Sequence, residues 1–328
     1  MDINAVKNIT KGAYNIYSED DAVYFERFSK RQKEAYAENG GLRVRSLCAS
    51  GICFDFVTDS AYVKVGYKVM SRARDFGYFD LYIDNIFVES IGDDCLSDGT
   101  AEFKIPKDGC KEHRVTIYLP HLSELGIIGF ETEENASVIP VKKEEKLLLC
   151  LGDSITQGMD AKYPSSPYPV QLARELNMEL LNQGVGGYVY NGKSVDKDLN
   201  INPDLITVAY GTNDWNLCKS RAEFSENTDN YFKTLTSVYD AKITYVITPI
   251  WRFDIDNTMP LGSFNDLVVI ITEKAEKYGI KNIINGIHLV PNDIKYFAGD
   301  TNVHPSDLGF MYYFKNLLRY TKSNIKMI

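Results

Sequence analysis

A short segment near the middle of the chain ends an apolar run on a hydroxyl group. In LLLCLGDSITQG, Leu147 to Gly158, the residues Gly152-Asp153-Ser154 follow the apolar run directly. A serine after a strand most often caps the next helix. It can also act as a nucleophile, if a nearby imidazole accepts its proton. Ser154 is therefore either a helix cap or the nucleophile of an acyl-transfer reaction.

The chain has four histidines, and His304 is the best candidate for the base. His113 and His121 lie in a half of the chain with a strand-like pattern, and His288 has no acid close upstream. A single histidine is more often a surface or core residue than a base. The sequence thus offers one plausible pair, Ser154 as nucleophile and His304 as general base.

An acyl-transfer site also needs hydrogen-bond donors aimed at the developing oxyanion. Two segments offer them, NQGVGG (182–187) and GTND (211–214). Gly187 can bring its backbone N–H close because it has no side chain, and Asn213 carries a side-chain amide. Taken singly, such segments are ordinary turns. Their order along the chain, each at the end of an expected strand, favours a shared site.

The second half of the chain alternates short apolar runs with helix-like segments. The runs are KLLLCLGDS, MELLNQGVGG, DLITVAYGTND, KITYVITPIW and KNIINGIHL. Strands that are apolar throughout and alternate with helices are typical of a parallel sheet covered on both faces. Functional groups in such sheets gather beyond the carboxyl ends of the strands. The pattern therefore predicts an α/β fold that brings the candidate residues to one edge.

The first half has a different pattern, with short alternating runs separated by Gly, Asp, Asn and Pro, which predicts a β-sandwich. LYIDNIFVE is expected to be a hairpin that turns at Asp84-Asn85. The segment before Gly40 is either a short helix ending there or a loop. The charged segment at 131–146 is expected to connect two domains, residues 1–141 and 142–328.

Composition narrows the classes of function. The net charge of −9 disfavours nucleic acid and anionic membranes as partners. No apolar run approaches the roughly 20 residues of a membrane span, and no signal peptide is visible, which predicts a cytoplasmic location. The six cysteines have no C-x-x-C spacing, so a metal site is not expected. The oligomeric state stays open.

Four motifs, GDS, NQGVGG, GTND and HPSDLG, together resemble those of the SGNH (GDSL) hydrolase superfamily. The resemblance covers roughly residues 146 to 328. The resemblance implies a flavodoxin-like three-layer domain without a metal or organic cofactor. It implies that Ser154 is the nucleophile and that His304, in HPSDLG, is the base. It also implies an oxyanion hole made by the backbone N–H groups of Ser154 and Gly187 and the side chain of Asn213.

The β-rich half resembles the N-terminal domain of some bacterial SGNH esterases. ASGICFDFVTDS and GYFDLYID are similar to segments of the jelly-roll-like β-sandwich in enzymes similar to carbohydrate esterase family two. That resemblance implies a serine esterase that removes acetyl or other short acyl groups from a sugar. The implied partner is a small-molecule or oligosaccharide ester.

The last motif departs from the family pattern, which usually has an aspartate three residues before the histidine. Here that position is Thr301, and Asp300 lies four residues before His304. Asp300 is predicted as the acid of a triad. The alternatives are Thr301, a backbone carbonyl or a water molecule that orients the ring, or a Ser-His pair that works alone. Asp307 is expected to be structural, as a cap of the last helix.

Other residues are candidates for the cleft. Trp251 and Arg252 follow the fourth apolar run and could contact a sugar, or else the Trp packs internally and the Arg forms a salt bridge. Tyr163 and Tyr168 are expected near the entrance.

Two other functions stay open, a thioesterase or lysophospholipase-type hydrolase and a non-catalytic carbohydrate-binding protein. A phosphate cradle at 182–192 is disfavoured because the G-x-G-x-x-G spacing is absent.

Overall fold

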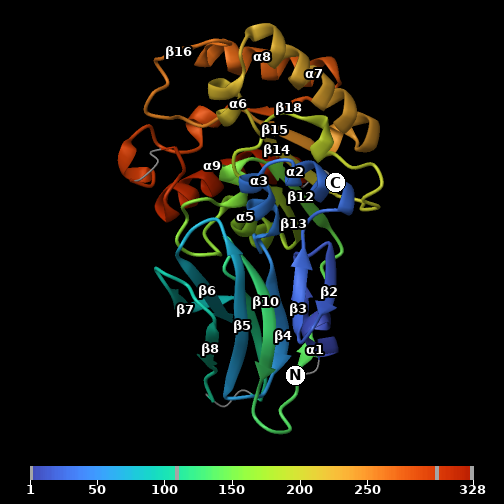
Figure 1. The fold of residues 1–328 in the computed structure, drawn as a ribbon, viewed down its shortest axis with the longest axis vertical. Helices are drawn as coiled ribbons and strands as arrows, with labels where there is room; N and C mark the ends of the chain where they lie inside the picture. Colours follow the sequence, from blue (N-terminus) through green and yellow to red (C-terminus); the bar gives the residue numbers. More distant parts are fainter. Residues whose placement is uncertain (1–2, 108–110, 300–302, 326–328) are drawn as a thin grey trace.

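The computed structural model describes residues 3–107, 111–299 and 303–325. The chain forms a β-rich part and an α/β part that are stacked along the long axis of the molecule (Figure 1). Within the described residues, no helix has both the length and the apolar character needed to cross a bilayer.

The α/β part is built on a parallel sheet. Its strands are β12 (Leu147–Gly152), β13 (Glu179–Gly184), β14 (Leu205–Ala209), β15 (Thr244–Ile247) and β18 (Asn282–Ile284). They lie side by side in the order β13-β12-β14-β15-β18, and every pair is parallel. This is the flavodoxin-like order. The predicted α/β fold is therefore confirmed, with all five apolar runs forming strands.

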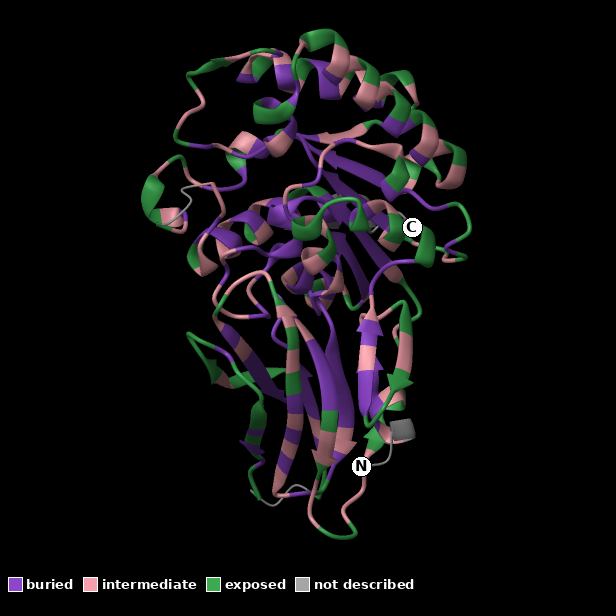
Figure 2. Ribbon diagram, viewed as in Figure 1, coloured by how far each residue is buried: buried purple, intermediate pink, exposed green. Residues whose placement is uncertain are grey.

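Helices cover both faces of this sheet. They are α4 (Ser154–Gln157), α5 (Tyr168–Leu176), α6 (Thr212–Leu217), α7 (Arg221–Val238), α8 (Phe264–Lys277) and α9 (Asp307–Ile325). On one face, Leu149 and Leu151 share a core with α7 and α8, whereas Leu148 and Cys150 on the other face pack with α5 and α9. Burial of both faces explains why the strands are continuously apolar (Figure 2).

Short elements connect these layers. They are the 3-10 turns η1 (Gly192–Ser194), η2 (Ala241–Ile243), η3 (Gly286–His288) and η4 (Ile294–Tyr296), and the two-stranded β16 (Thr258–Met259) and β17 (Gly262–Ser263).

The β-rich part consists of two antiparallel sheets. One has the order β1-β4-β9-β6-β7, with β11 paired to β4, and the other has the order β2-β3-β10-β5-β8. The strands are β1 (Thr10–Lys11), β2 (Asn15–Glu19), β3 (Ala22–Glu26), β4 (Cys53–Thr58), β5 (Tyr62–Arg72), β6 (Gly77–Ile83), β7 (Ile86–Asp93), β8 (Gly99–Lys104), β9 (His113–Tyr118), β10 (Ser123–Glu131) and β11 (Ile139–Pro140). Residues from both sheets share one apolar core, as in the contact of Phe25 with Phe54. The sheets therefore form the predicted sandwich.

The hairpin prediction is confirmed. Strands β6 and β7 are joined by Asp84 and Asn85, whose φ angles are 50° and 67°. A two-residue turn with positive φ at both positions matches the twist of an antiparallel pair, and Asp-Asn tolerates that conformation.

The region before residue 48 is more regular than the sequence indicated. It contains α1 (Ile3–Ile9), α2 (Lys30–Ala37) and α3 (Gly40–Leu47), so Gly40 begins a helix instead of ending one. Ser29 and Gln32 form a capping box at the start of α2. Phe28 and Tyr36 belong to the core of the α/β part. Figure 1 accordingly shows α2 and α3 beside that part, although they precede most of the sandwich in sequence. The domain division at 141 and 142 stays a prediction.

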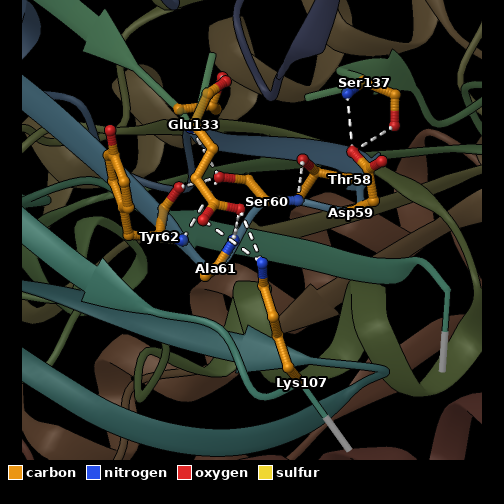
Figure 3. A network of polar contacts seen from close by, with 9 residues as sticks. Thr58, Asp59, Ser60, Ala61, Tyr62, Lys107, Glu133 and Ser137 are labelled. Atoms are coloured by element: carbon orange, nitrogen blue, oxygen red, sulfur yellow. Dashed lines mark hydrogen bonds and ion pairs between the residues drawn. The ribbon is translucent and has the colours of Figure 1, made fainter. Parts of the chain in front are cut away.

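The loop between β4 and β5 is held by a polar network (Figure 3). The carboxylate of Glu133 accepts a hydrogen bond from the backbone of Ala61 and pairs with Lys107, while Asp59 accepts from Ser137. These contacts join the loop to the chain that follows β10. The charged side chains in this region therefore have a structural role.

Candidate active site

Ser154 lies at the start of α4, in the sharp turn that follows β12. Asp153 caps this helix, with its Oδ1 accepting from the N–H of Ile155, and Gly158 ends it at φ 92°. A Cβ on Gly152 would come within 2.0 Å of Thr156 Oγ1, so only glycine fits before the turn. Ser154 is the first residue of α4, whereas the side chain of Asp153 forms the cap. The cap alternative for Ser154 is therefore wrong.

His304 meets this serine across 150 residues of sequence. Its Nε2 lies 2.8 Å from Ser154 Oγ. The histidine precedes α9, and its backbone carbonyl accepts from the N–H of Ala298. The structure thus brings together the two residues predicted as nucleophile and base.

The carboxylate at the other ring nitrogen is Asp160. Its Oδ2 lies 2.5 Å from His304 Nδ1, and its Oδ1 lies 2.5 Å from Nε of Arg74. The sequence had placed Asp300 in this role, and Asp300 lies outside the described residues, as does Thr301. Among the described residues, Asp160 is the carboxylate within hydrogen-bonding distance of Nδ1. The role of Asp300 stays a prediction.

Asp160 is held as a charged group. Burial raises the pKa of its carboxyl, but the hydrogen bonds with His304 and Arg74 outweigh burial, so the pKa lies well below its ordinary value. The side chain is only 4% exposed, and the φ of Asp160 is +66°. Asp307 accepts from the N–H groups of Lys162 and Tyr163, which fixes the loop after Asp160. Asp307 is thus structural, but the prediction that it caps the last helix is wrong, since the side chain of Ser306 accepts from the N–H of Gly309 at the start of α9.

The expected oxyanion donors lie on neighbouring loops. In the described part of the chain, the backbone N–H groups of Ser154 and Gly187 have no acceptor. Gly187 has φ +84°, a conformation that favours glycine. One amide N–H of Asn213 donates to the carbonyl of Tyr188 at 3.0 Å, which leaves the second N–H for another acceptor.

Two further carboxyls are buried behind these loops. Burial raises the pKa of both Asp153 and Asp214 to about 7. Asp153 Oδ1 accepts from Ile155, and Asp214 Oδ1 accepts from the N–H of Tyr190. Both groups therefore hold backbone N–H groups of the loops around the site.

The loop that carries Gly187 is anchored from the β-rich part. Arg27 is buried, and its guanidinium donates to the carbonyls of Asn182 and Gly184 at 2.6 and 3.0 Å. Gln157 of α4 binds the same loop, because its Oε1 accepts from the N–H of Gly186. Sequence reasoning missed Arg27, since nothing in its neighbourhood indicates a contact 155 residues away.

Trp251 and Arg252 have internal contacts. Arg252 is 4% exposed, binds Asp254 through two nitrogens and donates to the carbonyl of Thr212. This is the salt-bridge alternative, so the predicted sugar contact by Arg252 is not supported. Trp251 packs on Phe297 in the segment that leads to His304, with ring centroids 5.3 Å apart.

The two tyrosines predicted at the entrance differ. Tyr168 is fully buried, stacks on Tyr313 and bonds to Thr156, so its prediction was wrong. Tyr168 is the first residue of α5, and its side chain lies in the apolar core. Tyr163 is partly exposed and lies edge-to-face with Tyr78 of β6, where the two parts of the molecule meet.

A cavity of about 470 Å³ lies elsewhere, where α5 and the start of β13 meet the β-rich part. Its lining contains Lys11 and Arg114, both paired with Asp55, but neither Ser154 nor His304. It is at the opposite end of the strands from the site. No cluster of metal-binding side chains occurs among the described residues.

Comparisons with known proteins agree with this fold. The sequence profile of the GDSL-like Lipase/Acylhydrolase family matches residues 150–311. No sequence among curated proteins matches significantly.

Solved structures share the whole architecture. The salicylyl-acyltransferase SsfX3 from a tetracycline biosynthetic pathway has a TM-score of 0.80 at 17% identity, covering 96% of this chain and 94% of the other. A candidate GDSL-like lipase from Bacteroides ovatus scores 0.74 at 21% identity, covering 98% and 97%. A family two carbohydrate esterase from Clostridium thermocellum scores 0.62 at 16%, covering 86% and 94%. At these identities the likeness establishes the fold. Residues 150–311 of this chain belong to the GDSL-like lipase/acylhydrolase family.

Proposed function

We propose that this protein is a serine esterase that removes acetyl or another short acyl group from an oxygen ester, with an acylated carbohydrate as the natural class of substrate. The observation that carries the proposal is the continuous chain of contacts from Ser154 through His304 to Asp160. Such a chain activates a hydroxyl nucleophile and fixes the tautomer of its base.

The proposed reaction has two halves. Ser154 Oγ attacks the ester carbonyl carbon while His304 Nε2 accepts the hydroxyl proton, and the negative charge moves to the carbonyl oxygen. The N–H groups of Ser154 and Gly187 and the amide of Asn213 stabilise that oxygen. His304 then returns the proton to the departing alcohol, which leaves an acyl group on Ser154.

Water completes the cycle. It enters the place of the alcohol, gives a proton to His304 and attacks the acyl carbonyl. Collapse of the second intermediate releases the carboxylic acid and returns the proton to Ser154 Oγ. Throughout, Asp160 stabilises the imidazolium without taking its proton.

The choice of a short acyl group on a carbohydrate has separate support. It rests on the family two carbohydrate esterases among the structural neighbours and on the sandwich packed beside the site. A thioesterase or lysophospholipase-type activity remains the second candidate within the hydrolases.

The test compares wild-type protein with Ser154→Ala and His304→Ala on p-nitrophenyl acetate. We expect both variants to lose at least about 10³-fold in kcat, since each removes a member of the catalytic unit. A fluorophosphonate should label the wild type but not Ser154→Ala. Equal activity of wild type and Ser154→Ala would overturn the mechanism. A panel of acetylated sugars and p-nitrophenyl esters of increasing chain length then tests the substrate class.

The non-catalytic carbohydrate-binding alternative makes the opposite prediction. A protein that binds glycans but neither hydrolyses an activated ester nor reacts with the fluorophosphonate would favour that alternative.

A further inference from the structure

A guanidinium group from the helix α3 lies beside the proposed oxyanion hole. Arg45 belongs to α3, and its Nη1 donates to the carbonyl of Gly186 at 3.0 Å. A Cβ built on Gly187 would come within 3.0 Å of the same nitrogen. The guanidinium therefore contacts Gly186 and lies next to Gly187, the residue proposed to offer its N–H to the oxyanion.

This charge has no protein counterion in the part of the chain that the structure describes. No carboxylate pairs with Arg45 there, and its only acceptor is the neutral carbonyl of Gly186. The side chain is half-buried, so water screens it incompletely. Burial lowers its pKa, and the positive charge of Arg74 lowers it further. A partly desolvated cation without a counterion costs free energy unless a ligand supplies the opposite charge.

Arg74, whose guanidinium also lies near this site, differs from Arg45 because it has a counterion. Arg74 is neutralised by Asp160, with 2.5 Å between Nε and Oδ1. Among the described residues, Arg45 is therefore a cation without a carboxylate partner beside the Gly186–Gly187 loop, although the whole chain carries a net charge of −9. A local positive site in an acidic protein focuses anions toward that site.

We propose that Arg45 binds a carboxylate or phosphate group on the substrate, so that the natural ester is anionic. This inference rests on the proposed esterase function and adds the substrate's charge to it. One N–H of the Arg45 guanidinium donates to the carbonyl of Gly186. The other N–H groups of this planar group are available to donate to the anion. The anion and the reacting carbonyl would lie on either side of the Gly186–Gly187 backbone.

The experiment uses matched esters that differ in one charge. On the alcohol side the pair is 4-acetoxybenzoate and its methyl ester, with 4-acetoxyphenyl phosphate as the phosphate arm. On the acyl side the pair is the 4-nitrophenyl monoester of succinate and its methyl ester. For each pair, kcat/KM of the anionic ester is divided by that of the neutral one, in the wild type and in Arg45→Gln.

We expect Arg45→Gln to lower this ratio by roughly 10- to 100-fold on at least one side of the ester, mainly through KM. Arg45→Lys keeps the charge but not the fork, and should restore part of the ratio. Arg43→Gln is the matched control: Arg43 is exposed on the same helix and should leave the ratio unchanged. The anionic ester whose kcat/KM ratio falls most in Arg45→Gln identifies the anionic group that Arg45 recognises.

A purely structural role for Arg45, or a role in stabilising the oxyanion, would lower kcat/KM equally for anionic and neutral esters. That result overturns the inference, as does an unchanged ratio. Wild-type hydrolysis of the neutral esters keeps these outcomes separate from failure of the proposed function. If the wild type hydrolyses none of the esters and the fluorophosphonate does not label Ser154, both proposals fall.

Discussion

Arg74, two residues beyond the end of β5, donates from its Nε to Asp160 Oδ1 at 2.5 Å, while the other oxygen of that carboxylate meets His304. A residue of the sandwich thus contacts the group that orients the candidate base. The side chain of Arg74 is 24% exposed and that of Asp160 is 4% exposed, so the pair is only partly screened by water. The β-rich part therefore contributes directly to the geometry of the site.

Replacing Asp160 by Asn should lower kcat strongly. The amide has nearly the shape of the carboxylate, but it cannot stabilise an imidazolium and can impose the wrong tautomer on His304. We expect a loss of roughly 10²- to 10⁴-fold on p-nitrophenyl acetate, measured under saturating ester.

The matched control for that experiment is Asp300→Asn, the acid that sequence spacing favours. Its kcat should stay within a few-fold of the wild type. The assignment of Asp160 would be wrong if Asp300→Asn were the inactive variant and Asp160→Asn the active one.

Removing the charge of Arg74 tests its role as a positioning residue. In Arg74→Gln, we expect the acid limb of the kcat/KM profile to move to higher pH, because loss of the nearby cation raises the pKa of the Asp160 carboxyl. The rate at the optimum should fall about 10-fold, since one charge-assisted hydrogen bond is lost. The pH profile of p-nitrophenyl acetate hydrolysis measures both effects.

Two variants separate this role from general stability. Arg74→Lys should return part of the acid limb toward the wild-type position. Arg72→Gln removes a more exposed cation from the end of β5 and should leave the profile unchanged. An identical profile for Arg74→Gln and the wild type would exclude a positioning role.

The sequence predicted those features of the site that depend on local pattern. Ser154 and His304 were identified because apolar runs ending in small or polar residues mark the carboxyl edge of a parallel sheet. Asp160 was missed because spacing before His304 was used to choose the acid. The available signal was a carboxylate two residues after Gly158, the glycine that ends α4 at positive φ.

Residues that act across the two parts of the molecule could not be predicted in this way. Arg27, Arg45 and Arg74 reach loops that are 86 to 157 residues away in sequence. Hydrophobic periodicity reports which face of an element is buried, but it does not report which surface lies opposite. The same limit explains Tyr168, whose burial depends on its stacking partner Tyr313.

Arg27 should be among the most sensitive positions for stability. Its guanidinium donates to four carbonyls, those of Cys48, Asn182, Gly184 and Arg45, and it is 1% exposed. In Arg27→Met these buried acceptors lose their donors, which should cost about 3 kcal/mol or more of the free energy of unfolding. A thermal melt should show a fall in Tm of roughly 5–10 °C.

The control for Arg27 is Arg31→Met. Arg31 has a side chain that is 58% exposed and lies 3.7 Å from Asp196, so its loss should change stability by less than about 0.5 kcal/mol. Equal melting temperatures for Arg27→Met and the wild type would show that the four carbonyls find other donors.

His121 should make stability depend on pH below neutrality. Its Nε2 lies 3.0 Å from the carbonyl of Gly158, to which it donates, and burial lowers the pKa of the imidazole to about 4. The unfolded chain, with a pKa near 6.5, then binds more protons than the folded one between pH 4 and 6.5. Stability due to this group is therefore complete above pH 6.5 and falls by about 3 kcal/mol as the pH drops to 4. In urea titrations across this range, His121→Gln should show a flatter dependence than the wild type, whereas the exposed His288→Gln should follow the wild type. Parallel curves for all three proteins would mean that His121 titrates alike in the folded and unfolded states.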